Sequence, residues 1–318
     1  MLSRPLLLAY ADGGVANVQQ LSFYLSSFQR WAPQDALTVL FTTKAMIDQQ
    51  GNLSYPYRDR VELNDAHILD CAVAKRAVIR RFVVFRDWLQ NHKEHFGPVL
   101  IADIRDLWFQ ADPFASVIGN QTVHVYQEGL GLLENEPKQR PYNTRWLMSC
   151  RGIGASGYKK LLAARASVVC GGTMAATSVS AMLLLLDRML PFLQNGCNDQ
   201  AALIYASQFL LPAAGVPVHN VPMRHASVAH CFTEVNPNHP CVMKHGLRPL
   251  DLRLDSLGRI LNDLGEPYAV IHQADRFPDL WMRRNWPLLS LTSDADMKLD
   301  NYTPSCAASR SHVVECCT

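Results

Sequence analysis

The stretch that decides the fold reads Pro-Val-Leu-Ile-Ala-Asp-Ile-Arg-Asp-Leu-Trp-Phe-Gln-Ala-Asp-Pro-Phe and covers residues 98–114. Its apolar run, residues 99–102, is short and uninterrupted, which is typical of a strand buried on both faces of a largely parallel sheet. Charged side chains follow at once, at Asp103, Arg105 and Asp106. In open α/β sheets, ligands bind where the carboxyl ends of strands meet the next loops, so Asp103 is a site candidate. The alternative is that Asp103 caps a helix and Asp106 lies in its first turn.

The N-terminal part of the chain predicts a strand, a helix and a second strand. Residues 6–11 form a compact apolar run that ends in the polar turn Asp12-Gly13-Gly14. Apolar residues then recur at helical spacing, which predicts an amphipathic helix over residues 16–31, and residues 36–42 predict the second strand. This order suits a nucleotide-binding α/β half, although other doubly wound folds share it. Residues 51–65 are polar and turn-rich, and residues 65–92 have the pattern of a long, partly basic helix.

Two later blocks also combine a buried strand with polar groups. Gly171 and Gly172 interrupt a strand over residues 168–177, and paired glycines in a strand indicate that something approaches the backbone closely. After a helix over residues 179–190 comes Asp199, which is either functional or the N-cap of a helix over residues 200–209. A third apolar strand, residues 268–271, ends at His272. Its imidazole is either a metal ligand or a structural side chain.

These blocks, in this order, resemble the GT-A-fold glycosyltransferases. The motifs are Asp103-Ile104-Arg105-Asp106, then Asp199-Gln200, then His272-Gln273-Ala274-Asp275-Arg276. The first corresponds to the branch of the family with Asp-X-Arg-Asp in place of Asp-X-Asp. The resemblance covers roughly residues 5–285 and implies a single α/β domain of the GT-A, Rossmann-like type. It would have a mixed, mostly parallel central sheet flanked by helices.

On this resemblance, residues 1–290 form the catalytic domain and residues 291–318 a polar tail. Residues 1 to about 115 would be the nucleotide-binding half, and residues 116–290 the half for the sugar and the acceptor. The implied reaction transfers a sugar from a UDP- or GDP-linked donor to a hydroxyl acceptor such as a glycan. Asp199 and Gln200 would be the catalytic residues. Asp199 would act as general base in an inverting enzyme and would orient the sugar in a retaining one.

The resemblance also implies a divalent cation, Mn²⁺ or Mg²⁺, held by Asp103, Asp106 and His272. Arg105 stands where the family usually has its second metal carboxylate, so the cation either has fewer protein ligands or is partly replaced by a protein cation. Asn143 and Trp146 are acceptor candidates, with loop packing as the alternative. The expected donor contacts are Tyr10, Ala11, Asp12, Lys75, Arg81, Asp103, Ile104, Arg105, Gly171, Gly172, Gln273 and Arg276. For Lys75 and Arg81, which lie in the helical pattern over residues 65–92, the alternative is a solvated helix face.

Two other functions remain open from the sequence. A catalytically inactive relative that binds a glycan or a nucleotide sugar would explain Arg105 in place of a carboxylate. A sugar nucleotidyltransferase would share the nucleotide-binding sheet. However, such an enzyme normally has a basic, glycine-rich phosphate loop near its N-terminus, and Asp12-Gly13-Gly14 lacks a lysine or arginine.

Composition and sequence patterns limit which partners and which cellular compartment we expect for the protein. A net charge of +2 does not indicate a nucleic acid partner, and no apolar run is long enough to span a bilayer. The N-terminus has no signal-peptide pattern, so a cytoplasmic protein is favoured. The alternative is a luminal fragment, for which the sequons at Asn52, Asn120 and Asn301 would matter. Nine cysteines without a C-x₂-C pair predict neither a zinc site nor a disulfide framework, and most are expected to be reduced.

Overall fold

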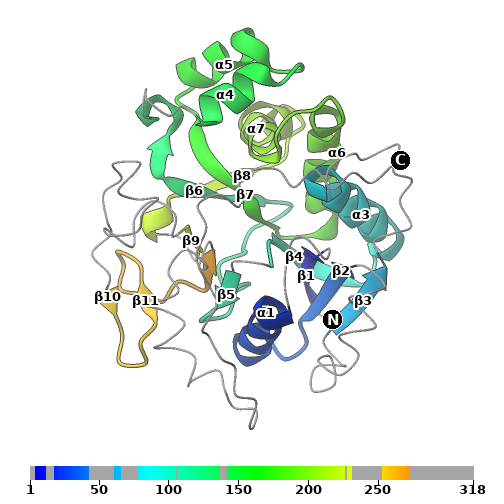
Figure 1. Cartoon of the computed structure of the whole chain (residues 1–318), viewed down its shortest axis with the longest axis vertical. Coiled ribbons are helices and arrows are strands. Elements are labelled where there is room, and N and C mark those ends of the chain that lie inside the picture. The colour runs from blue at the N-terminus through cyan, green and yellow to red at the C-terminus, as the bar shows by residue number, and fades with distance from the viewer. Residues whose placement is uncertain are drawn as a thin grey trace.

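The computed structural model describes residues 4–11, 18–42, 61–65, 77–104, 107–136, 142–225, 228–230 and 253–272. These residues form an α/β fold whose central seven-stranded sheet is mixed, mostly parallel and flanked by helices (Figure 1). The expected fold class is confirmed at this level. The division of the chain into two functional halves stays a prediction, and the polar tail lies outside the described residues.

The central sheet has the strand order β3-β2-β1-β4-β7-β6-β8. Neighbouring strands from β3 to β4 are parallel, β7 runs antiparallel to both β4 and β6, and β8 is parallel to β6. The reversal at β7 places the middle of that strand beside the carboxyl end of β4. The strands are β1 (Arg4–Ala11), β2 (Leu37–Thr42), β3 (Val61–Asp65), β4 (Phe96–Ala102), β6 (Val123–Leu132), β7 (Ser167–Ala176) and β8 (Val218–Val221).

Helices bury both faces of the sheet. Along β1, Leu6 and Leu8 join one apolar cluster with α3 and α6, whereas Leu7 and Ala9 join another with α1. This alternation follows from the two-residue period of a strand, and it explains why the buried part of β1, residues 6–11, is apolar on both faces. Each fully buried leucine contributes about 1.5–3 kcal/mol. The helices that line the two clusters are α1 (Val18–Trp31) on one side and α3 (Ala77–His92), α4 (Tyr142–Ser149), α5 (Gly154–Ala163), α6 (Val179–Gln194) and α7 (Asp199–Tyr205) on the other.

A second, three-stranded sheet lies beside the end of β4. It consists of β5 (Leu107–Phe109), β12 (Val270–His272) and β9 (Val228–His230), with β12 antiparallel to β5 and parallel to β9. A hairpin of β10 (Arg253–Leu254) and β11 (Ile260–Leu261) is attached through Gln110, whose buried amide exchanges two hydrogen bonds with the backbone of Ile260. Because His272 pairs with Leu107, the small sheet brings residue 272 next to the segment that follows β4.

Several expected elements are confirmed, and two segments differ from the expectation. The strands and helices expected from residues 6–11, 16–31, 36–42, 168–177 and 179–190 correspond to β1, α1, β2, β7 and α6. The segment over residues 51–65, described from its sequence as polar and turn-rich, ends in the strand β3, which pairs with β2 and was not predicted. Asp65 lies in that strand, so the long helix does not begin there. Its described part starts at Ala77.

The remaining elements are short. Among the described residues, no helix has the length and apolar character needed to cross a membrane. The chain between α7 and β8 continues as a helix whose middle part, η4, widens to a π-turn. The short elements are η3 (Leu133–Asn135), η4 (Ala206–Leu210), α8 (Leu211–Ala213) and η5 (Met223–His225).

Candidate functional site

The site forms where the carboxyl end of β4 meets the middle of β7. Ala102 is the last residue of β4 and pairs with Thr173. The Asp103 N–H donates to the carbonyl oxygen of Gly172 at 2.9 Å, so the strand pairing extends one residue further. This hydrogen bond fixes the backbone of Asp103 at the strand end, and its side chain stays 32% exposed. Asp103 therefore follows a strand rather than capping a helix.

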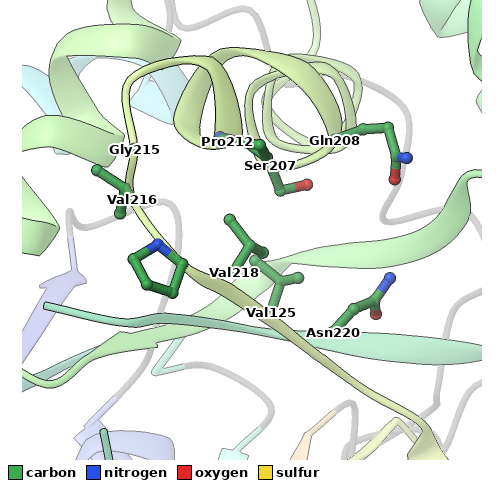
Figure 2. Close-up of a pocket in the computed structure, with 9 residues that line it drawn as sticks. Val125, Ser207, Gln208, Pro212, Gly215, Val216, Val218 and Asn220 are labelled. Carbon is green, nitrogen blue, oxygen red and sulfur yellow. The ribbon is translucent and has the colours of Figure 1, made fainter. Parts of the chain in front are cut away.

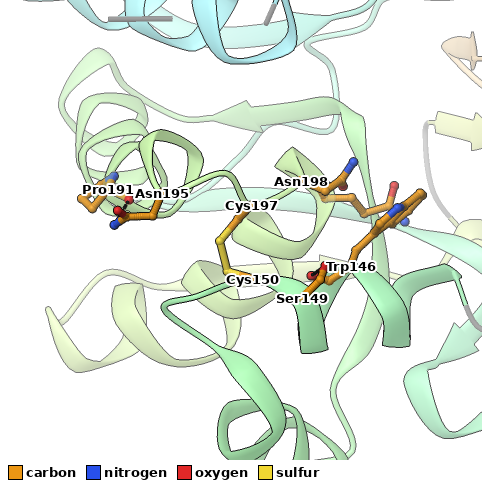
Figure 3. The surroundings of a disulfide bond; sticks show 8 residues. Trp146, Ser149, Cys150, Pro191, Asn195, Cys197 and Asn198 are labelled. Atoms are coloured by element: carbon orange, nitrogen blue, oxygen red, sulfur yellow. Dashed lines mark hydrogen bonds between the residues drawn. A yellow bond between two sulfur atoms is a disulfide. The ribbon is translucent and has the colours of Figure 1, made fainter. Parts of the chain in front are cut away.

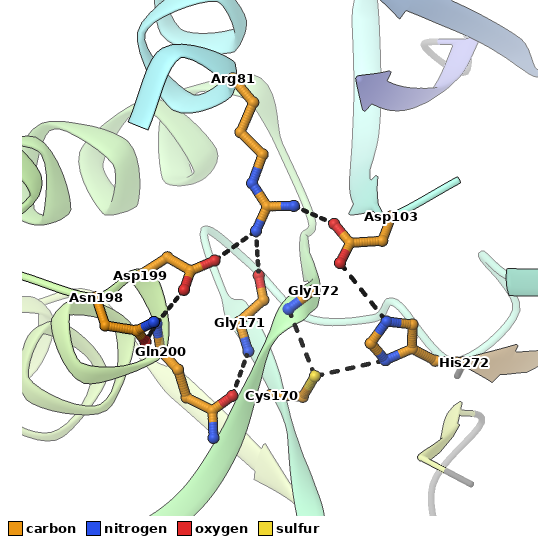
Figure 4. Close-up of polar contacts among 9 residues, drawn as sticks. All are labelled: Arg81, Asp103, Cys170, Gly171, Gly172, Asn198, Asp199, Gln200 and His272. Carbon is orange, nitrogen blue, oxygen red and sulfur yellow. Dashed lines mark hydrogen bonds and ion pairs between the residues drawn. The ribbon is translucent and has the colours of Figure 1, made fainter. Parts of the chain in front are cut away.

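Arg81 bridges the two carboxylates of the site (Figure 4). Its Nη1 is paired with Asp103 Oδ1, and its Nη2 lies 2.5 Å from Asp199 Oδ2 and 3.3 Å from the carbonyl oxygen of Gly171. Burial alone would lower the pKa of the guanidinium, but the charges and hydrogen bonds of Asp103 and Asp199 outweigh it and raise that pKa. Arg81 thus stays charged, and it links β4, β7 and α7. The solvated-face alternative does not hold for this residue.

His272 and Cys170 lie on the side of Asp103 opposite to Arg81. His272 is buried, with Nε2 3.7 Å from Asp103 Oδ2 and Nδ1 3.5 Å from Cys170 Sγ. The Gly172 N–H donates to the same sulfur at 3.4 Å. Burial raises the pKa of the Cys170 thiol, and the nearby His272 opposes that shift only in part. A neutral thiol therefore holds one nitrogen of the imidazole while the other faces the carboxylate.

The two glycines of β7 leave room for these side chains. A Cβ at Gly172 would lie 2.6 Å from Asp103 Oδ2 and 2.7 Å from His272 Cε1. A Cβ at Gly171 would lie 3.1 Å from the Gln200 nitrogen and 3.2 Å from Asp199 Oδ2. The backbone of β7 is approached closely at both glycines, while the approach of a sugar there stays a prediction. The groups that approach are side chains of the protein itself.

Asp199 and Gln200 are positioned by the start of α7. Asn198 is the N-cap, because its Oδ1 accepts from the Gln200 N–H, so the interpretation of Asp199 as the cap was wrong. Asp199 Oδ1 accepts from the same N–H at 2.9 Å, which leaves Oδ2 for Arg81. The Gln200 side chain donates from Nε2 to Asn143 Oδ1 at 2.8 Å, and its Oε1 accepts from the Gly171 N–H at 3.4 Å.

Asn143 is a buried link instead of an exposed acceptor contact. Its side chain donates to Glu136 Oε1 at 3.1 Å and accepts from Gln200, and its backbone N–H donates to the same Glu136 oxygen. The other Glu136 oxygen accepts from the backbone and the hydroxyl of Thr144. Glu136 therefore binds the first turn of α4 and, through Asn143, orients Gln200. The sequence offered no signal for Glu136 or Cys170.

The other expected contacts lie nearby or outside the described residues. Tyr10 and Ala11 are buried at the end of β1, and the side chain of Ile104 is buried in the α1 cluster, so only its backbone could meet a ligand. Trp146 is partly buried on α4, with its ring 6.1 Å from that of Tyr142. Six candidates lie outside the described residues: Asp12, Lys75, Arg105, Asp106, Gln273 and Arg276.

The metal ligands expected from the resemblance are brought together only in part. Asp103 and His272 face each other, whereas Asp106 is not among the described residues. Within the part of the chain that the structure describes, no cluster of three or more His, Cys, Asp or Glu side chains could hold a metal ion. The described donors are thus one carboxylate and one imidazole.

A disulfide, Cys150–Cys197, joins α4 to the start of α7 (Figure 3). Both cysteines are buried, and their Cα atoms lie 4.6 Å apart. Cys150 directly follows α4, and Cys197 precedes Asp199 by two residues. The expectation that no disulfide pairing is signalled was wrong for this pair. The segment that carries Asp199 is therefore attached to α4 on both sides. The disulfide holds it at Cys197, and the hydrogen bond to Asn143 holds it at Gln200.

Removal of this disulfide is expected to lower the free energy of unfolding by about 2–4 kcal/mol, because it closes a loop with a sequence separation of 47 residues. The test is chemical unfolding of wild type and of the Cys150→Ala/Cys197→Ala variant, each with and without dithiothreitol. Reductant should destabilise the wild type and leave the double variant unchanged. Equal stability of oxidised and reduced wild type would contradict the prediction.

A pocket of about 490 Å³ lies away from this site, between η4 and the paired strands β6 and β8 (Figure 2). One wall of the pocket is the π-turn of η4. There the Leu211 N–H donates to the Ala206 carbonyl five residues earlier, next to Pro212, which has no N–H to continue the regular helical pattern. The residues that line the pocket are Val125, Ser207, Gln208, Pro212, Gly215, Val216, Pro217, Val218 and Asn220. None of them is an expected site residue.

No family model matches the chain, and no curated protein matches its sequence.

Proposed function

We propose that the protein is a glycosyltransferase that transfers a sugar from a nucleoside diphosphate sugar, UDP- or GDP-linked, to a hydroxyl group of an acceptor such as a glycan. One observation supports this most directly. Asp103, Asp199 and His272 come from three separated blocks of the sequence, and all three lie around Gly171 and Gly172. These are the blocks on which the resemblance to GT-A enzymes rests, and the resemblance requires them to form one site.

The charges of the described residues indicate why a cation would be required. Arg81 is already paired with Asp103 and Asp199, so one positive charge stands against two negative ones. Such a site repels a diphosphate unless further positive charge is added. A divalent cation would supply it, as would the basic residues Lys75, Arg105 and Arg276.

Asp103 and His272 suit a divalent cation that takes its remaining ligands from the donor. A carboxylate oxygen and an imidazole nitrogen are ligands that Mn²⁺ accepts, and Mg²⁺ sites commonly use one or two carboxylates with substrate phosphates. The two side chains face each other over Gly172, where no Cβ intrudes. A bound cation would neutralise charge that develops on the leaving diphosphate. Arg81, whose charge is balanced by Asp103 and Asp199, would hold the Asp103 carboxylate in position for the cation.

The contacts of Asp199 favour a role in orienting the donor sugar. One of its oxygens accepts from Arg81 and the other from the Gln200 N–H. A carboxylate fixed from both sides is well suited to hold a hydroxyl in a defined direction. Gln200 would act beside it, since its amide is oriented by Asn143.

The acceptor would bind against α4. Tyr142 is 43% exposed, and its ring and that of Trp146 form a tilted pair on this helix. Aromatic faces of this kind pack against the apolar faces of sugars, and their polar atoms bond hydroxyl groups. In this proposal Trp146 contacts the acceptor directly, and Asn143 acts only through Gln200.

A glycan- or nucleotide-sugar-binding relative without catalytic activity is the second candidate, because Arg105 replaces a metal carboxylate. The sugar nucleotidyltransferase remains the third. The three differ in what they do with a bound donor. A transferase releases free nucleoside diphosphate, a binding protein releases nothing, and a nucleotidyltransferase releases pyrophosphate from a nucleoside triphosphate.

The test is calorimetric titration of UDP and GDP into the metal-free protein, with and without Mn²⁺. We expect Mn²⁺ to strengthen the binding of one nucleotide at least about tenfold, equivalent to about 1.4 kcal/mol. Asp103→Asn should abolish that enhancement. Asp112→Asn is the matched control, because the Asp112 carboxylate accepts from the Phe114 N–H in the turn after β5 and is not bonded to Arg81. It should bind as wild type does.

The outcomes separate the candidates. Binding of neither nucleotide under any condition would overturn the assigned site. Tight binding that is indifferent to metal would mean that arginine and lysine side chains replace the cation. In a parallel incubation with the corresponding nucleotide sugar and Mn²⁺, slow release of free sugar would support transferase chemistry, and binding without release would favour the inactive relative.

A further inference from the structure

The turn before β6 presents an asparagine in a sequon. Asn120-Gln121-Thr122 matches Asn-X-Thr, and Asn120 is exposed. Gly119 and Gln121 on either side have positive φ angles of 120° and 51°, which make the turn tight. The Thr122 hydroxyl donates to the Asn120 carbonyl oxygen at 3.2 Å.

The neighbours of Asn120 are fixed to the adjoining segment of the chain. The Thr122 N–H donates to Thr177 Oγ1, and Ser178 Oγ donates to Gln121 Oε1, both at 2.9 Å. The turn is therefore attached at the residues after Asn120, whereas Asn120 itself is at the surface. An exposed asparagine on a tight turn is sterically open to a bulky modification.

The disulfide gives an independent indication of the compartment. Cys150–Cys197 is buried on both sides, between α4 and α7. Disulfides of this structural kind form and persist in oxidising compartments and are rare in the cytosol. This argues against the cytoplasmic location favoured by the sequence and for the luminal alternative, in which asparagine in a sequon is modified.

We propose that the protein matures in an oxidising secretory compartment and that Asn120 carries an N-linked glycan. The co-reactant is an oligosaccharide on a lipid diphosphate. A bond forms between Asn120 Nδ2 and the anomeric carbon of the oligosaccharide, and the bond between that carbon and the phosphate oxygen breaks. The lipid diphosphate leaves with the bonding electrons, and Nδ2 gives up one proton.

Asn120 lies away from the candidate site. Asn120 precedes β6, whose first residue, Val123, pairs with Ala176 of β7. The candidate site lies further along β7, at Gly171 and Gly172. At about 3.3 Å per residue, Ala176 and Gly172 are roughly 13 Å apart along β7. This inference does not depend on the proposed function. The other sequons, at Asn52 and Asn301, lie outside the described residues.

The test uses the protein isolated from the cells that make it, with variants expressed from the full reading frame in the same cells. Enzymatic removal of N-glycans in H₂¹⁸O should convert Asn120 to ¹⁸O-labelled aspartate in the tryptic peptide, and non-reducing digestion should give a peptide pair joined by Cys150 and Cys197. Asn120→Gln should remove one glycan step in gel mobility. Thr122→Val should do the same, although Asn120 is retained.

Thr122→Ser is the matched control, because it keeps the sequon and should keep the glycan. Two results would overturn the proposal. One is an unmodified Asn120 in protein that contains the Cys150–Cys197 bond. The other is recovery of both cysteines as free thiols, which would place the protein in a reducing compartment.

Discussion

Replacement of Arg81 by methionine is expected to destabilise the protein by about 3–5 kcal/mol and to abolish nucleotide binding, the largest effect of any single substitution described above. Arg81 is only 13% exposed and forms ion pairs with both Asp103 and Asp199. Methionine fills a similar volume but leaves two neighbouring carboxylates without their cation. Denaturant unfolding measures the stability, and calorimetry with UDP and GDP measures the binding.

Arg86→Met is the matched control, since Arg86 lies on the same helix. It pairs with Asp87 and Asp187 at 3.0 Å, but its side chain is 41% exposed. Ion pairs of that kind contribute about 0–1 kcal/mol, so this variant should unfold and bind nearly as wild type does. Asp199→Asn in the Arg81→Met background removes one of the two carboxylate charges left without Arg81, and it should restore part of the stability. Equal losses for Arg81→Met and Arg86→Met would contradict the assigned role.

Gly172→Ala is expected to cost about 1–3 kcal/mol of stability and to weaken nucleotide binding at least about tenfold. The new Cβ would lie 2.6 Å from Asp103 Oδ2 and 2.7 Å from His272 Cε1. β7 is hydrogen-bonded to β4 and β6, so its backbone cannot move away without breaking strand pairing. Asp103 and His272 must separate instead. Thermal unfolding and Mn²⁺-dependent nucleotide titration measure the two effects.

Gly171→Ala provides a graded comparison in the same strand. Its Cβ would meet the Gln200 nitrogen at 3.1 Å and Asp199 Oδ2 at 3.2 Å, which small shifts of α7 can relieve. We expect a smaller loss of stability than for Gly172→Ala and a weaker effect on metal dependence, because Asp103 and His272 are untouched. If Gly171→Ala were the more damaging of the two, the described packing around Asp103 would be wrong.

The sequence predicted the buried strands well because their short apolar runs are compatible with few other kinds of secondary structure. β1, β2, β4 and β7 are buried on both faces, and their residues are apolar nearly throughout. β3 was missed because it lies at the edge of the sheet, where Val-Glu-Leu-Asn-Asp resembles a polar loop. Secondary structure at an edge depends on the partner strand, which local sequence does not reveal.

The site was predictable where polar residues follow buried strands, and less so where contacts cross the fold. Asp103 and His272 fell in that class, whereas Gly172 was indicated by the glycine pair within a strand, and the structure brings the three together. The bridge from Arg81 to both carboxylates depends on the position of α3 over the sheet, which the sequence of the helix does not specify. Likewise, nothing in the spacing of Cys150 and Cys197 distinguishes them among nine cysteines.

Two residues that follow the Asp-X-Arg-Asp motif have structural roles. Gln110 binds the backbone of Ile260 and so attaches the β10–β11 hairpin to the small sheet. Asp112 accepts from the Phe114 N–H and closes the turn after β5. The stretch from Asp103 to Asp112 therefore combines a site residue with residues that hold the surrounding segments, so its sequence does not by itself show which residues act on a ligand.

The small sheet affects the order in which the protein acquires its site during synthesis. β12 is the last described strand, and it supplies His272 by pairing with β5 and β9, which are made earlier. Chains fold progressively as they emerge from the ribosome, so Arg81, Asp103 and Asp199 can assemble while the imidazole is still unsynthesised. A nascent chain that ends before β12 would then have the ion-paired carboxylates but lack the His272 imidazole, so the described side-chain cluster would be complete only after the final strand docks.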